Sequence, residues 1–143
     1  MTTPTNTVEL LRRDEGEKLS AYQDHLGFWT IGVGRLIDAR KGGGISPQES
    51  EILLTNDLDR ITKALDARLP QWRALNDARQ AVLVSMAFQM GVDGLLGFKN
   101  TLAHIFAGNL ADAKMGMLAS KWATQTPERA GRLAQQMERG VFV

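Results

Sequence analysis

Residues 14–34 read DEGEKLSAYQDHLGFWTIGVG, and this stretch marks a change of secondary structure. Gly16 is a natural stop for a short helix that begins after Asn6, so we expect a helix over about residues 7–15. From residue 18 to residue 36, aromatic and β-branched residues that favour strands are punctuated by glycines. This pattern predicts a small twisted hairpin or three-stranded sheet near the N-terminus, and no other β structure.

Residues 46–70, SPQESEILLTNDLDRITKALDARLP, predict one long helix. Ser46, Pro47 and Glu49 combine a helix N-cap, a first-turn proline and the acid of a capping box. Leucine and isoleucine then recur at helical spacing until Pro70. A helix over about 47–69 is long enough to connect two lobes.

The remainder of the chain predicts further helices. Asn76 caps an apolar segment that Gly91 closes, and its near-continuous hydrophobicity predicts a helix buried on all sides. Shorter helices are expected at about 101–107 and 109–119, and Thr126-Pro127 opens a last helix that Gly140 ends.

These elements predict a mostly helical α+β fold in a single domain over residues 1–143. Its small, sheet-containing lobe is expected at about 17–53, the connecting helix at about 47–69 and a helical lobe at about 70–143. We expect the N-terminal helix, 7–15, to belong with the helical lobe.

The composition of the chain argues against several classes of protein. The 143 residues carry a formal net charge of +1, with 43% hydrophobic and 23% charged residues and no cysteine. Disulfides are therefore impossible, and the small charge argues against a duplex nucleic acid partner, whose binding requires many neutralised phosphates. The sequence has neither a signal-peptide pattern at its start nor an apolar run of about 18 residues, so we expect no membrane insertion.

Two carboxylates and a hydroxyl lie near the predicted sheet. Glu15 comes at the end of the first helix, and Asp24 and Thr30 lie on either side of a turn. Two acids beside a cleft are the usual equipment for breaking glycosidic bonds, because one donates a proton and the other handles water or positive charge. For Asp24 a second interpretation stays open, since aspartate is also favoured in turns, where it bonds its own backbone.

Five short motifs occur in order along the chain. They are Asp14-Glu15-Gly16, Asp24-x5-Thr30-Ile31-Gly32-Val33-Gly34, Phe88-Gln89-Met90-Gly91, Gly97-Phe98-x-Asn100 and Trp122-x-x-Gln125-Thr126-Pro127-x-Arg129-Ala130. On these motifs the chain resembles the phage lysozymes or endolysins of glycoside hydrolase family 24, whose type member is the T-even phage lysozyme. The similarity runs nearly end to end.

This resemblance implies a lysozyme-like two-lobed fold and a muramidase that cuts the β-1,4 bond between N-acetylmuramic acid and N-acetylglucosamine in peptidoglycan. Glu15 matches the proton-donating acid of the family. Asp24 matches the carboxylate that orients the attacking water, and Thr30 matches the hydroxyl that helps to hold this water. The family is associated with inversion at the anomeric carbon.

The resemblance also implies substrate-binding residues. Leu36, Phe88, Gln89 and Thr101 align with residues that line the glycan cleft of the family, and Arg129 aligns with the partner of the catalytic acid. Gly116 stands where the type member has a side chain able to bond sugar. By their helical spacing alone, Phe88, Met86 and Met90 are expected in the core. Trp122 is also expected there, because single tryptophans in a domain of this size are usually partly buried anchors.

We expect no metal and no cofactor, because His25 and His104 stand apart and no cysteine accompanies them. The implied partner is the glycan strand of bacterial peptidoglycan. As a phage endolysin the chain is expected to be a monomer held in the host cytoplasm until a separate holin releases it to the cell wall in the periplasm.

Two other functions stay open. A lytic transglycosylase needs the acid but no positioned water, whereas Asp24 and Thr30 favour hydrolysis. From a different class, the chain could be a peptidoglycan-binding or particle-associated module that has kept the scaffold and lost turnover; the intact set of Glu15, Asp24 and Thr30 disfavours this.

Overall fold

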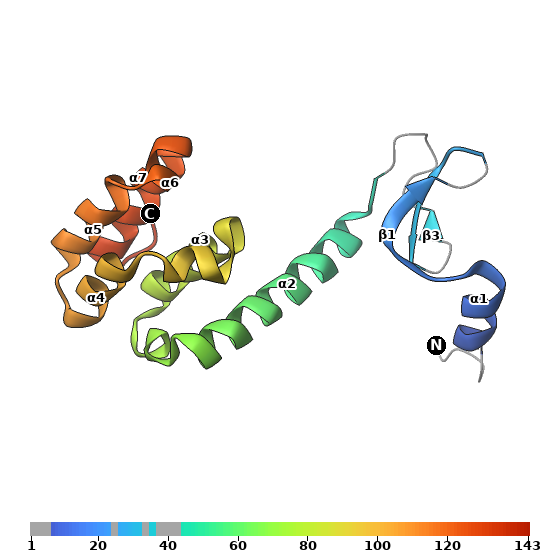
Figure 1. Cartoon of the computed structure of the whole chain (residues 1–143), viewed down its shortest axis with the longest axis horizontal. Coiled ribbons are helices and arrows are strands. Elements are labelled where there is room, and N and C mark those ends of the chain that lie inside the picture. Colours follow the sequence, from blue (N-terminus) through green and yellow to red (C-terminus); the bar gives the residue numbers. More distant parts are fainter. Residues whose placement is uncertain (1–6, 24–25, 33–34, 37–43) are drawn as a thin grey trace. The chain divides into compact units, whose positions relative to one another are not determined.

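The computed structural model describes residues 7–23, 26–32, 35–36 and 44–143. They are mostly helical with a small antiparallel sheet, which confirms the predicted α+β class (Figure 1). Contacts divide the chain into two compact units, Met1–Leu53 and Leu54–Val143. The lobe boundaries expected from the sequence stay predictions.

The first unit contains the helix α1 (Thr7–Glu15) and the strands β1 (Lys18–Gln23), β2 (Trp29–Gly32) and β3 (Arg35–Leu36). The strands form an antiparallel sheet in the order β1-β2-β3. Tyr22 lies opposite Thr30 in one pair of strands, and Thr30 lies opposite Leu36 in the other. The predicted short helix and three-stranded sheet are therefore confirmed, and Thr30 sits on the central strand.

The long helix α2 (Pro47–Arg68) begins with the predicted capping box. The Glu49 side chain accepts a hydrogen bond from the Ser46 backbone N–H at 3.0 Å, and the Ser46 hydroxyl oxygen accepts one from the Glu49 N–H at 3.1 Å. Two of the donors that a helix start leaves without partners are thereby satisfied. Local residues alone fix where this helix begins.

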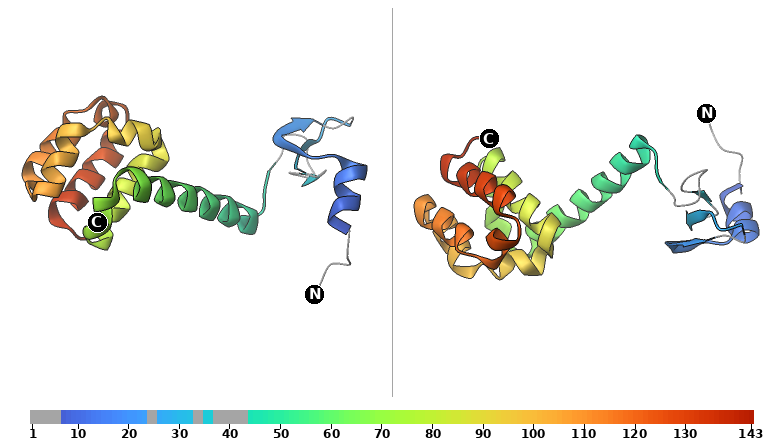
Figure 2. Two further views of the ribbon diagram at one scale, coloured as in Figure 1. Left: turned by 60° about the horizontal axis from the view of Figure 1, so that its bottom comes forward. Right: turned by 90° about the horizontal axis from the view of Figure 1, so that it is seen from above.

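The second unit continues with a 3-10 turn, η1 (Pro70–Ala74), and five helices that pack together (Figures 1 and 2). These helices are α3 (Asp77–Leu96), α4 (Lys99–Ala107), α5 (Leu110–Leu118), α6 (Lys121–Gln125) and α7 (Pro127–Arg139). The sequence predicts α3, α4, α5 and α7 but not η1 and α6. Both missed elements are only five residues long, too short for a helical repeat of apolar residues to show.

The helix α3 begins after Asn76, as the sequence predicts. At Gly91, where the sequence predicts its end, the helix is kinked. The Asn76 side chain accepts a hydrogen bond from the Arg79 N–H at 3.0 Å. Gly91 has φ 80° and ψ 159°, which breaks the helical path, although the helix resumes and ends at Leu96. A left-handed φ of this kind is available to glycine without steric cost, so Gly91 ends the first segment as expected.

The core of the second unit surrounds α3. Val82, Leu83 and Met86 of this helix are each at most 1% exposed. The same buried cluster includes side chains from the other elements of the unit, among them Leu65, Trp72, Leu102, Met117, Trp122 and Met137. Among the described residues, no single helix is long and apolar enough to cross a membrane, although α3 and α4, bent by 103°, pass such a test together.

Arg79 joins the beginning of α3 to the end of α7. Its guanidinium donates hydrogen bonds to the Met137 and Glu138 carbonyl oxygens at 2.8 and 3.0 Å, and the Asn76 amide donates to the Gly140 carbonyl at 2.9 Å. Carbonyls at a helix C-terminus have no partner within the helix, so the arginine serves as a cap supplied by another helix. Gly140 follows with φ 71° and lies against the guanidinium.

A second polar cluster fixes the turn after α2. The Asp66 carboxylate accepts hydrogen bonds from the Trp72 indole at 2.9 Å and from two nitrogens of Arg73 at 2.8 and 3.0 Å. Arg73 also lies 4.1 Å from the centre of the Trp72 ring. Hydrogen bonds from Arg73, and then from Trp72, hold the pKa of Asp66 below its ordinary value.

Gly140→Ala should destabilise the fold by about 1–2 kcal/mol, because a residue with a side chain is strained at this φ. A Cβ atom there would also lie 2.8 Å from the Arg79 guanidinium carbon. Urea unfolding measures the effect. Gly131→Ala is the matched control, since a Cβ at this position in α7 meets nothing within 4 Å. It should stabilise the protein by up to about 1 kcal/mol; equal effects of the two changes would contradict this account of the α7 cap.

The ionisation of Asp66 should make the free energy of unfolding depend on pH in the acidic range. Its pKa is lowered in the folded protein, so its contribution is fully present above the unfolded pKa of an aspartate, about 3.9, and is lost as the pH falls through the lower folded pKa. We expect the thermal midpoint of the parent to fall more steeply with acid than that of Asp66→Asn, which keeps an acceptor oxygen but has no charge. The difference should be small because the group is exposed. Parallel midpoint curves would contradict the prediction.

Candidate active site

In the first unit, the structure confirms that the predicted acid lies at the end of a helix. Glu15 is the last residue of α1, and Gly16, with φ 75°, donates a backbone hydrogen bond to Arg12 at 2.9 Å. The Glu15 side chain lies outside the described part of the chain, as does the whole of Asp24. The convergence of the two carboxylates therefore stays a prediction.

Thr30 has the clearest geometry of the three predicted catalytic residues. Its side chain is 5% exposed, and its hydroxyl donates a hydrogen bond to the Phe28 carbonyl oxygen at 3.1 Å. A hydroxyl has one proton to donate and two lone pairs that accept. With its proton directed at Phe28, the Thr30 oxygen can accept a hydrogen bond from a water molecule, which is the chemistry that its predicted role requires.

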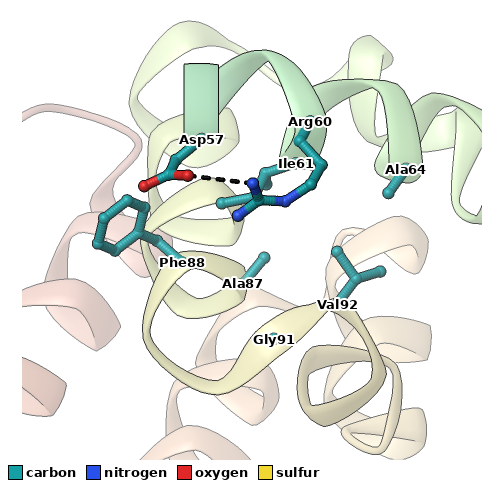
Figure 3. Close-up of a pocket in the computed structure, with 8 residues that line it drawn as sticks. All are labelled: Asp57, Arg60, Ile61, Ala64, Ala87, Phe88, Gly91 and Val92. Carbon is teal, nitrogen blue, oxygen red and sulfur yellow. Dashed lines mark ion pairs between the residues drawn. The ribbon is translucent and has the colours of Figure 1, made fainter. Parts of the chain in front are cut away.

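In the second unit, Phe88 is at the edge of the core and lines a pocket. Its side chain is 49% exposed, so the spacing-based expectation that Phe88 is a core residue is wrong. The pocket has a volume of about 520 Å³ and lies between α2 and α3 (Figure 3). It is lined by Asp57, Arg60, Ile61, Ala64, Ala87, Phe88, Gly91 and Val92.

The Phe88 pocket combines an apolar floor with one ion pair. Asp57 and Arg60 are one turn apart on α2, and their side chains approach to 3.1 Å. The Arg60 side chain is largely exposed and the Asp57 side chain is partly exposed, so this ion pair contributes little to the free energy of unfolding. An exposed aromatic ring beside polar groups is a surface on which a sugar ring can stack while its hydroxyls are bonded.

Gln89, the next residue on α3, is held by Trp122 of α6. The Gln89 Oε1 atom accepts a hydrogen bond from the Trp122 indole Nε1 at 2.9 Å. An indole nitrogen can only donate, so the amide oxygen must face Trp122 and the amide NH₂ group must face away from it. Gln89 is exposed, and its NH₂ group makes no hydrogen bond within the described part of the chain. Two donors are therefore available to a ligand at a fixed position.

Trp122 orients the candidate site residue Gln89, although the sequence predicts only a core position for it. It is indeed buried, and Phe98 packs edge-on against it at 6.2 Å between ring centres. Its second role, as the partner of Gln89, could not be found from the sequence, because the two residues are 33 positions apart. No local motif predicts a contact of this separation.

The other predicted substrate residues lie on separate elements. Thr101 is in the first turn of α4 and is buried, and Arg129 is exposed in the first turn of α7. Arg129 makes no ion pair with any side chain that the structure describes, and Leu36 lies on β3 with its side chain outside that set. That these residues share one cleft with Glu15 and Thr30 stays a prediction.

Comparisons with known proteins agree on one family. A family model described as phage lysozyme matches residues 12–139. The chain is 32% identical to "Probable T4-type lysozyme 1" of Dictyostelium discoideum over 94% of each protein, and 31% identical to the endolysin of Salmonella phage P22 over 87% of this chain and 86% of that one. It is 33% identical to the pre-baseplate central spike protein Gp5 of Enterobacteria phage T4 over 88% of this chain but only 26% of the spike protein.

Gln89→Leu should lower the free energy of unfolding by about 1 kcal/mol, because the Trp122 indole N–H loses its acceptor. It should also shift the emission of Trp122. Urea unfolding followed by tryptophan fluorescence measures both effects.

Gln89→Glu is the matched control, since a carboxylate can accept the same hydrogen bond while it removes the NH₂ donors. It should unfold close to the parent. If the two substitutions destabilised the protein equally, the bond to Trp122 would not be what holds residue 89.

Proposed function

Because the chain belongs to the phage lysozyme family and is a peptidoglycan hydrolase, we propose that it cleaves the β-1,4 bond between N-acetylmuramic acid and N-acetylglucosamine. Glu15 is the proposed general acid. It donates its proton to the glycosidic oxygen as the bond to the anomeric carbon breaks. The observation that carries the proposal is the family match over residues 12–139, which includes Glu15, Asp24 and Thr30.

Water completes the proposed reaction. Asp24 accepts a proton from the water that attacks the anomeric carbon on the face opposite to the leaving group, and this gives inversion. The Thr30 hydroxyl donates its own proton in the bond to the Phe28 carbonyl, so its oxygen accepts a hydrogen bond from the second O–H of this water, which keeps that hydrogen. An inverting enzyme needs room for the water, so the carboxyl groups of Glu15 and Asp24 should lie about 6.5–9.5 Å apart.

The glycan strand is proposed to contact the second unit at Phe88 and Gln89. Phe88 offers an exposed ring beside the pocket, and the NH₂ group of Gln89 can donate to a sugar hydroxyl or to the carbonyl of an N-acetyl group. Leu36, Thr101 and Arg129 complete the proposed cleft, with Arg129 as the partner of Glu15. The chemistry needs no metal or cofactor in this scheme.

The proposed biological role is host cell lysis by a monomeric endolysin. The enzyme would wait in the host cytoplasm until a holin opens the membrane, and would then act on the wall from the periplasm. Cells that produce the chain alone should stay intact, and cells that also produce a holin should lyse. Lysis from within by the chain alone would overturn the requirement for a holin.

Glu15→Gln should lower the rate of wall clearing by roughly 10²–10⁴-fold, because it removes the transferable proton at nearly constant shape. The decrease in turbidity of purified cell walls measures this rate. Glu9→Gln is the matched control, since Glu9 is an exposed acid in the first turn of the same helix. It should clear walls at the parent rate; an equal rate for Glu15→Gln would show that Glu15 is not the acid.

Purified cell walls also distinguish the proposed hydrolase from a lytic transglycosylase and from a binding module. Mass spectrometry of the released muropeptides should show reducing ends, whereas a lytic transglycosylase leaves 1,6-anhydro ends. A binding module without turnover would sediment with walls and never clear them. We expect this behaviour from Glu15→Gln and not from the parent.

A further inference from the structure

The short helix α6, which carries Trp122, is held at both ends by hydroxyl groups. At its start, the Ser120 hydroxyl oxygen accepts a hydrogen bond from the Ala123 N–H at 3.2 Å, and the same hydroxyl donates one to the Met117 carbonyl oxygen at 2.7 Å. At its end, the Thr126 hydroxyl donates to the Trp122 carbonyl oxygen at 3.0 Å. A helix of five residues has too few internal hydrogen bonds to persist by itself, so its position depends on contacts of this kind.

Ser120 uses both the proton and a lone pair of its hydroxyl. A hydroxyl has one proton to donate and two lone pairs that accept. The proton of Ser120 goes to a carbonyl near the end of α5, and the oxygen caps the start of α6. Ser120 therefore joins two helices, and Trp122 lies within the turn that this cap closes.

Trp122 passes this position on to Gln89. The indole ring is packed edge-on against Phe98, and its Nε1 atom donates to the Gln89 Oε1 atom at 2.9 Å. Gln89 is exposed on another helix, and within the described part of the chain its side chain has no other hydrogen bond. The direction of the Gln89 amide therefore depends on where α6 holds the indole.

We propose that Ser120 is a positioning residue for glycan binding. By capping α6 it keeps Trp122 in place, and Trp122 keeps the NH₂ donors of Gln89 directed at the ligand. A donor that is oriented before the ligand arrives need not be ordered on binding, which favours affinity. The inference rests on the proposed function, because it takes the glycan strand as the ligand of Gln89.

A purely structural role of Ser120 predicts something different. If the cap only stabilised the fold, Ser120→Ala would lower the thermal midpoint and leave the folded protein with the affinity of its background. Gly140→Ala is the matched control for lost stability, because it acts at the end of α7, beside Arg79. Both variants are measured well below their thermal midpoints.

The first test needs no ligand and measures hydrogen exchange of the indole N–H groups by NMR. Ser120→Ala should raise the exchange rate at Trp122 by roughly 5-fold, because a lost N-cap makes the opening of α6 more frequent. The Trp72 indole, bonded to Asp66 at 2.9 Å, is the internal reference and should keep its rate. Ser120→Thr keeps the hydroxyl and should exchange like the parent, as should Gly140→Ala. An unchanged rate at Trp122 in Ser120→Ala would overturn the inference.

The second test measures binding of soluble glycan strands by calorimetry, in the Glu15→Gln background so that the ligand is not cut. Gln89→Leu should weaken binding by roughly 10-fold, the loss of about one hydrogen bond. Ser120→Ala should weaken it by roughly 5-fold, and Ser120→Thr should restore the affinity. Ser120→Ala added to Gln89→Leu should cause little further loss, because both changes act through one amide. Additive losses would contradict the relay.

The outcomes distinguish this inference from the proposed function. If the parent fails to clear walls, the proposed function fails, yet the binding test still decides the inference because it involves no turnover. If the parent clears walls but Ser120→Ala binds as tightly as Gly140→Ala, the inference alone is overturned. If Gln89→Leu binds like its background, the inference falls with the contact at Gln89, and the hydrolase stands.

A second variant keeps the question open to test if Ser120→Ala does not fold. Thr126→Val removes the hydroxyl that holds the Trp122 carbonyl at the other end of α6, and it keeps the shape of the side chain. It should likewise speed exchange of the Trp122 indole N–H and weaken glycan binding. Parent values in both measurements would overturn the inference.

Discussion

The second unit is organised by the burial of one side of α3. The expectation that this helix is buried on all sides is wrong, because Asp77, Phe88 and Asp93 are exposed, and only its apolar side joins the core formed with side chains of α2, η1 and α4 to α7. Val82 and Leu83 on that side are 0% exposed. The polar anchors of the unit lie at the borders of this core, where Arg79 caps α7 and Asp66 ties α2 to Trp72.

The candidate site of this unit lies where the first buried segment of α3 ends, at Ala87. Met86 and Ala87 are inside the core, and the next two residues, Phe88 and Gln89, are exposed. The kink at Gly91 follows at once and turns the chain away. A rigid, buried helix thus presents an aromatic ring and an amide at its edge, and the core residue Trp122 fixes the orientation of that amide. Support of this kind, by a residue that does not itself face the ligand, keeps donors in place before a ligand arrives.

Thr30 shows how a nearly buried hydroxyl can be oriented by its own backbone. Its hydroxyl donates a hydrogen bond to the Phe28 carbonyl oxygen, so its lone pairs stay available as acceptors. This arrangement suits the proposed role of Thr30 in holding a water molecule.

The sequence by itself determined the features that depend on neighbours within one turn of the chain. Ser46 with Glu49, Asn76 with Arg79, and the glycines after α1 and α7 fix helix ends through bonds that span three or four residues. The family motifs likewise identified the hydrolase, because they are read along the chain.

Only the tertiary structure decided the pairs that are far apart in sequence. Gln89 meets Trp122 across 33 positions, and Arg79 meets Met137 across 58. Spacing cannot predict such contacts, because they depend on how separate helices cross when they bury α3, and many sequences with the same local pattern would cross differently.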